Sequence, residues 1–265
     1  MIACLAEGQE AQRGNHHMPC ISGEWADDYS GFGNEILYDM CRREPRHDDL
    51  DVVCDKLWLI GRSHAASAER NRVKDYHLER TAWLIAESDI DARLAEAREI
   101  ERPTLDNLPL ILDTHRMLTG IFEHPGEAGG TGQRKRSLAS KYLHFHAPRA
   151  FFIYDSISLA SVERVLSSNG RAKYVEPDSL RDHGDPEYRR YAVRLIQYRD
   201  EILETELGKL ASPRCIDNQL QEYTWRRAWY QHRFANRAAG TAPPHIRASD
   251  LTRVGAVRIN RPWSG

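Results

Sequence analysis

The sequence has few cysteines and no apolar run of membrane-spanning length. Its five cysteines are odd in number and no two of them stand in a C-x-x-C spacing, which argues against a disulfide framework or a structural zinc site. The first residues also lack the basic start and apolar stretch of a signal peptide, and no hydrophobic segment is long enough to span a bilayer. We therefore expect a cytoplasmic protein with reduced thiols and no membrane partner.

The sequence also lacks a strong charge of one sign. The formal net charge is −2, so no global field would draw the chain onto nucleic acid. From residue 211 onward, however, nine arginines face only three acidic residues. This stretch is either a local basic surface or a solvated tail. The 41% of hydrophobic residues are typical of a folded globular protein.

Apolar residues recur at helical spacing through most of the chain. They predict an all-α, multi-helix globular protein with a central cleft and no internal repeat. The only strand-like segment is the apolar run at 150–154, which is too short to seed a sheet. The expected helices cover about 33–43, 48–65, 75–87, 90–100, 105–122, 137–146, 155–167, 187–209 and 217–234.

The same pattern suggests three parts of unequal size. Residues 1–24 are polar and aperiodic, and we expect a flexible leader there. Residues 25–235 would form the all-helical catalytic domain, for instance as two lobes around the cleft. Residues 236–265 carry Gly, Pro and Arg without a period and would form an extended basic tail.

The segment 131–156 (TGQRKRSLASKYLHFHAPRAFFIYDS) reads as a loop, a helix, an apolar run and an aspartate that begins a new helix. It resembles the helix-hairpin-helix (HhH-GPD type) DNA glycosylase superfamily over about a tenth of the chain. Ala139 matches the family's small residue, and Asp155, sixteen positions later, matches its catalytic aspartate. Two departures stand out: residues 133–136 replace the family's Gly-apolar-Gly hairpin turn, and Ser137 stands where bifunctional members carry a Schiff-base lysine.

The resemblance implies a monofunctional DNA glycosylase that uses water to hydrolyse the N-glycosidic bond of a damaged or modified base. Modified bases of bacteriophage DNA are one open class of substrate. Double-stranded DNA would be the partner, with no cofactor, no metal and no obligate protein partner. The base would first be flipped out of the duplex, which costs a few kcal/mol.

The residues themselves fit this chemistry in part. A carboxylate at Asp155 could stabilise the positive charge that develops on the sugar, although the same residue is also an ordinary helix N-cap. DNA phosphates would be held near the start of the helix expected at 137–146. The alternative to phosphate binding is that the cations form a solvated charge run and that the serine caps the helix. The predicted DNA contacts are Arg134, Lys135, Arg136, Ser137 and Lys141.

A pocket for the flipped base is predicted from aromatic and histidine side chains. Trp25 and Phe32 stand in a Gly-flanked loop before a helix, where a hydrophobic staple is the alternative. His144 and Tyr154 belong to the segment with the resemblance, and a core histidine is the alternative for His144. His144 and His146 stand two residues apart on a helix, a spacing unsuited to a shared metal.

Two other classes of function compete with base excision. A non-catalytic nucleic-acid-binding helical protein would keep the cations and use Asp155 only as a cap. A helical ribonuclease toxin would use an Arg–His pair such as Arg62 and His64.

Overall fold

The structure is a computed structural model that describes residues 32–63, 78–123, 135–170, 175–207 and 210–224. Every regular element in these ranges is helical, which confirms the all-α prediction. Residues 213–224 are also helical. The other elements are α1 (Phe32–Arg43), α2 (Leu50–Ser63), α3 (Leu78–Ala86), α4 (Ile90–Arg98), α5 (Leu108–Phe122), α6 (Arg136–His146), α7 (Ser156–Ser168), η2 (Asp178–Leu180), α8 (Pro186–Tyr198), η3 (Arg199–Leu203) and α9 (Glu204–Leu207).

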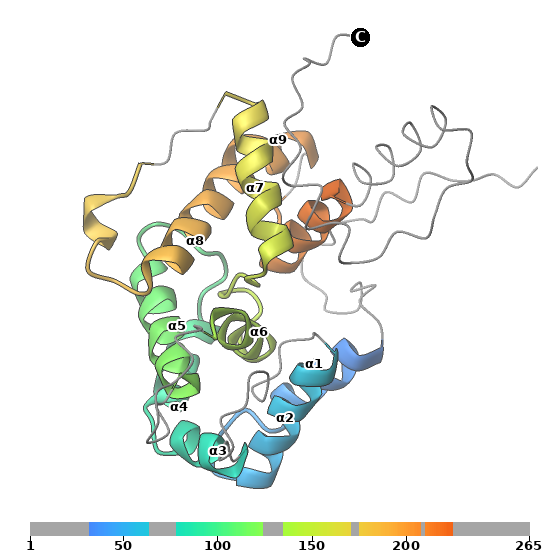
Figure 1. The fold of residues 1–265 in the computed structure, drawn as a ribbon, viewed down its shortest axis with the longest axis vertical. Helices are drawn as coiled ribbons and strands as arrows, with labels where there is room; N and C mark the ends of the chain where they lie inside the picture. Colours follow the sequence, from blue (N-terminus) through green and yellow to red (C-terminus); the bar gives the residue numbers. More distant parts are fainter. Residues whose placement is uncertain (1–31, 64–77, 124–134, 171–174, 208–209, 225–265) are drawn as a thin grey trace, which may run out of the picture.

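Helix α6 lies in the middle of the fold, with α1, α2 and α3 on one side and α7, α8 and α9 on the other (Figure 1). It packs against α1, α2, α4 and α5. All side chains from Leu138 to His146 are buried, so α6 has no solvent-facing stripe over this length. A helix buried all round acts as the core to which the others attach.

The apolar run at 150–154 forms no regular element and pairs with no strand in the described residues. Side chains satisfy its backbone instead, as buried polar groups require. Tyr188 and Tyr191 donate to the carbonyls of Phe152 (2.9 Å) and Ile153 (2.7 Å). The Tyr154 amide donates to Ser140 Oγ (2.9 Å). The segment is thereby fixed without a sheet.

Local sequence signals mark several helix ends. Gly170 follows the C-cap of α7 at φ +72°, the left-handed conformation in which glycine commonly ends a helix. At the start of α2, the side chain of Asp49 accepts hydrogen bonds from the amides of Asp51 (3.0 Å) and Val52 (3.3 Å).

The single helix expected at 187–209 is interrupted. Its middle forms the π-helical turn η3 between α8 and α9. The fully buried Arg199 lies at this turn, donates to the Pro103 carbonyl (2.7 Å) and pairs with Asp200. Long-range contacts of this kind leave no helical period in the sequence.

Several predictions fall outside the described residues. They are the leader 1–24, the tail 236–265 and the hairpin turn between α5 and α6. The hairpin geometry and the central cleft therefore stay predictions. None of the described helices is long and apolar enough to cross a membrane.

Candidate functional site

Asp155 occupies the N-cap of α7, with an extended backbone and a half-buried side chain. Its carboxylate accepts a hydrogen bond from the Ser158 amide at 2.7 Å. The first turn of a helix favours negative charge, because its free amides point toward the cap. The predicted capping role is confirmed, and it places the carboxylate at the end of the rigid 150–154 segment.

A second carboxylate, Asp217, lies close to Asp155 and was not predicted as a site residue. It is 2% exposed, and it accepts from the Ser158 hydroxyl (2.7 Å) and from Gln221 Nε2 (2.9 Å). Arg214 pairs with it at 3.2 Å. Ser158 thus joins the two carboxylates, giving its amide to one and its hydroxyl to the other.

The environment raises the pKa of Asp217 to about 6. The largest cause is burial, followed by the negative charge of Asp155, while Arg214 and the hydrogen bonds from Ser158 and Gln221 oppose the rise. Two neighbouring carboxylates in different environments are a common basis for acid and base roles. A signal for Asp217 was present in the sequence, since Asp217, Gln221 and Thr224 recur at helical spacing among the buried Ile216 and Leu220.

Arg136, a predicted DNA contact, is half-buried and pairs with carboxylates of the protein itself. Its guanidinium donates to both carboxylate oxygens of Asp185 (2.5 and 3.0 Å) and pairs with Glu187 at 2.8 Å. Glu187 also accepts from the Tyr154 hydroxyl. Asp185 in turn caps α8 through the amides of Glu187 (3.1 Å) and Tyr188 (3.0 Å). In this conformation Arg136 connects α6 to α8 and is not available to a phosphate.

Three other predictions are corrected by burial or position. Lys141 is only 7% exposed, so it offers little surface to a DNA backbone. Lys135, not Ser137, takes the N-cap position of α6, so the alternative of a capping serine was wrong, and the DNA contact of Ser137 stays a prediction. His144 is fully buried, with Nδ1 donating to the Phe151 carbonyl (2.9 Å) and Nε2 accepting from the Tyr38 hydroxyl (2.8 Å). The alternative of a satisfied core histidine was therefore the correct one.

The remaining predicted residues are only partly placed. Tyr154 is half-buried beside Arg136 and Glu187, and burial together with Glu187 raises its pKa. Lys135 precedes α6 and is half-buried. Phe32 begins α1, but its side chain is not among those described, and Trp25 and Arg134 lie outside the described residues.

Within the described part of the chain, no group of three or more His, Cys, Asp and Glu side chains could hold a metal ion. Comparison of the chain with protein-family models, with curated proteins and with solved structures finds no match. The function therefore has to be argued from the site itself. The site consists of one half-buried and one fully buried carboxylate, bridged by Ser158.

Proposed function

We propose that this chain is a monofunctional DNA glycosylase that hydrolyses the N-glycosidic bond of a damaged or modified base and leaves an abasic site. The observation that carries the proposal is the position of Asp155. It is a half-buried carboxylate at a helix N-terminus, at the end of a segment fixed by Tyr188, Tyr191 and Ser140.

The proposed hydrolysis does not require the protein to form a covalent bond with the substrate. As the base leaves, positive charge develops on the sugar, and a fixed carboxylate beside it lowers the energy of this transition state. Asp155 would take this role and orient the attacking water. The Ser158 amide holds one of its oxygens, so the carboxylate needs little rearrangement when charge develops.

Asp217 would support Asp155 without touching the substrate. It is buried behind Ser158, and its charge depends on pH because its pKa lies near 6. Above that value a second negative charge would add to the field around the sugar. We therefore expect the excision rate to rise with pH through about 6.

The DNA-binding surface in this proposal differs from the one predicted from the sequence. Arg136 is paired with carboxylates and Lys141 is buried, so neither supports the phosphate contact predicted for it. The described contacts give no support to a binding surface made of residues 134–136 together. The alternative of a non-catalytic binder, which uses these cations together with the basic C-terminal stretch, stays a prediction.

The test is an excision assay on the full chain. Duplexes that each carry one modified base, such as uracil, hypoxanthine, 8-oxoguanine or 5-hydroxymethylcytosine, are incubated with the protein and cleaved with alkali at abasic sites. Asp155→Asn should lower the rate at least about 100-fold. The thermal midpoint should change little, because asparagine also caps helices.

Asp89→Asn is a matched control, since Asp89 takes the N-cap position of α4 without a side-chain cap bond. It should leave excision unchanged. If the wild-type protein releases none of these bases, or if Asp155→Asn excises as fast as wild type, the proposal is wrong. DNA binding without product in both proteins would favour a non-catalytic binder.

A further inference from the structure

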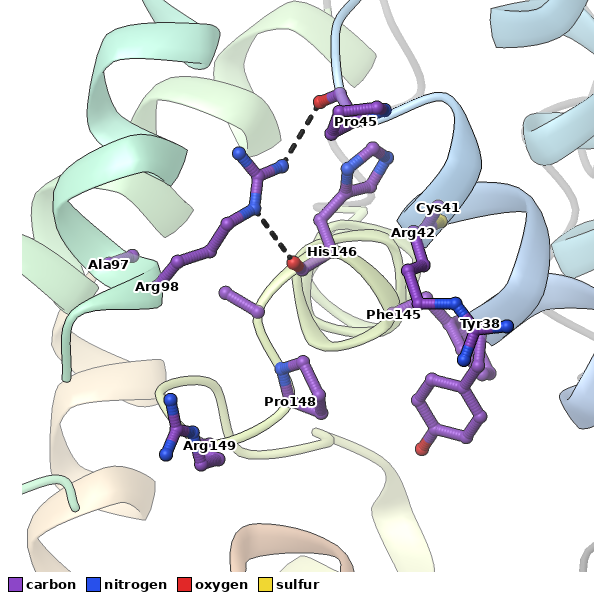
Figure 2. A pocket seen from close by; sticks show the side chains of 11 residues that line it. Tyr38, Cys41, Arg42, Pro45, Ala97, Arg98, Phe145, His146, Pro148 and Arg149 are labelled. Carbon is purple, nitrogen blue, oxygen red and sulfur yellow. Dashed lines mark hydrogen bonds between the residues drawn. The ribbon is translucent and has the colours of Figure 1, made fainter. Parts of the chain in front are cut away.

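A pocket of about 310 Å³ lies at the C-terminal end of α6. Its lining comes from α1, from α4, from the turn between α1 and α2 and from residues 145–149, and includes no residue of α7 or α8. Figure 2 shows Arg98 entering from α4, Arg42 and Tyr38 from α1, and Arg149 from the turn after α6. The volume falls at the lower end of the range for small-molecule sites.

The charges around this pocket are all positive. Three arginines line it, Arg42, Arg98 and Arg149, and no carboxylate does. Arg42 pairs with Asp39 on its own helix. Arg98 donates to two backbone carbonyls, those of His146 (3.3 Å) and Pro45 (3.0 Å). These bonds hold the guanidinium in place without neutralising it.

Arg149 has an exposed side chain and, within the described ranges, no ion pair. Two of the three arginines therefore line the pocket without a carboxylate partner among the described residues. The neighbouring His146 lies in the same positive field. Burial is the largest cause of its lowered pKa, and the positive groups Lys56, His47 and Arg98 lower that pKa further. An anion is the ligand that such a field would attract.

The rest of the lining is mostly apolar. The ring of Phe145 packs against that of Tyr38, with centroids 4.8 Å apart, and small or rigid side chains complete the wall. These include Cys41, Ala97, Ala147 and Pro148. A pocket with an apolar wall and a few fixed charges suits a ligand with an apolar body and one charged group.

We propose that this pocket binds a small organic anion, with one phosphate or carboxylate group held by Arg149 in the positive field of the lining arginines, and a compact apolar body against Phe145 and Pro148. Arginine suits either group, because its planar fork matches the two oxygens of an oxyanion. The site goes beyond the proposed excision activity and does not depend on it, since none of its lining residues belongs to the Asp155 site.

The experiment is isothermal titration of the full chain with four probes: deoxyadenosine monophosphate, benzoate, inorganic phosphate and deoxyadenosine. At least one of the two organic anions should bind with a stoichiometry of one. Which of them binds more tightly separates the phosphate from the carboxylate. Deoxyadenosine and inorganic phosphate should each bind at least about ten-fold more weakly, because each lacks one half of the recognised ligand.

Variants then locate the binding. Arg149→Ala should weaken the better organic anion at least about five-fold, and the fold should survive because the side chain is exposed. Arg181→Ala, which removes an equally exposed arginine outside the pocket, should change nothing. Asp155→Asn should also leave the affinity unchanged, which separates this site from that of the proposed excision reaction.

The proposal is overturned if neither organic anion binds, if inorganic phosphate binds as tightly as the organic anions, or if Arg149→Ala leaves the affinity unchanged. Failure of base excision with intact anion binding would reject the proposed function alone. Loss of anion binding in the Asp155→Asn variant would assign the anion to the excision site and reject the separate pocket.

Discussion

The imidazole of His115 lies flat on the phenol ring of Tyr188, with ring centroids 3.6 Å apart and ring planes within 9°. Both side chains are fully buried. His115 Nε2 lies 3.1 Å from the Arg136 carbonyl, so the pair joins α5, α6 and α8. The pKa of His115 is lowered to about 4; burial is the largest cause and the Arg136 charge adds to it, while the Arg136 carbonyl and Asp185 oppose the shift.

The first prediction concerns the acid stability that this pair sets. The unfolded histidine takes up a proton near pH 6.5, whereas the folded one does so only near 4. The contribution of neutral His115 to the free energy of unfolding is therefore fully present above pH 6.5. It is lost as pH falls toward about 4, by about 1.4 kcal/mol per pH unit. His115→Phe keeps a stacked ring and should make the free energy of unfolding, measured in urea, less dependent on pH over this range. An unchanged slope would contradict the assignment.

The second prediction concerns the ion pair of Arg136 and Asp185. The carboxylate is 3% exposed and the guanidinium 17%, so removing one partner leaves a nearly buried charge unpaired. Arg136→Ala should lower the free energy of unfolding by about 3 kcal/mol. Arg181→Ala, whose pair with Asp178 is exposed, should cost less than about 1 kcal/mol. If Arg136→Ala folds as stably as wild type and only weakens DNA binding, the sequence-based interpretation of Arg136 was right after all.

The third prediction compares two glycines that both have a positive φ angle. Gly184 and Gly170 have φ values of +67° and +72°. A Cβ on Gly184 would meet Leu112 Cβ at 2.6 Å, whereas one on Gly170 would have no atom within 4 Å. Gly170→Ala should therefore cost about 1 kcal/mol from the backbone alone. Gly184→Ala should cost about 3 kcal/mol, because the packing of α5 must also shift. Equal losses in urea unfolding would contradict this account of the Gly184 contact.

The fourth prediction concerns the buried carboxylate beside Asp155. Because the pKa of Asp217 is raised to about 6, its stabilising contribution is fully present below about pH 4 and is lost as pH rises through 6. Wild type should lose stability relative to Asp217→Asn by about 1.4 kcal/mol per pH unit across this range. The exposed Asp178→Asn is the control and should track wild type. Parallel stability curves for wild type and Asp217→Asn would show that Asp217 does not titrate as stated.

The same variant also probes the proposed activity. With Asp217 charged only above about pH 6, the excision rate of wild type should show an inflection there. Asp217→Asn should remove the inflection while keeping measurable excision, because Asp155 remains. Complete loss of excision at every pH, with a folded protein, would instead place Asp217 among the groups that act on the substrate.

Helical periodicity was sufficient to predict the class of fold and the approximate place of most helices. Capping chemistry located Asp155 at the start of α7 and Gly170 at its end, because these signals are local and act within one turn. The interruption at η3 was not predictable in this way. It involves Arg199 and the Pro103 carbonyl, which are far apart along the chain.

The sequence by itself determined that this chain folds into helices and that an aspartate caps the helix after the 150–154 run, since periodicity and caps depend only on near neighbours. Tertiary structure alone decided which charges are available. It placed Arg136 against Asp185, buried Lys141 in the core and brought Asp217 next to Asp155 through Ser158. Charge is a property of a residue, but exposure and pairing depend on segments that meet only when the chain has folded.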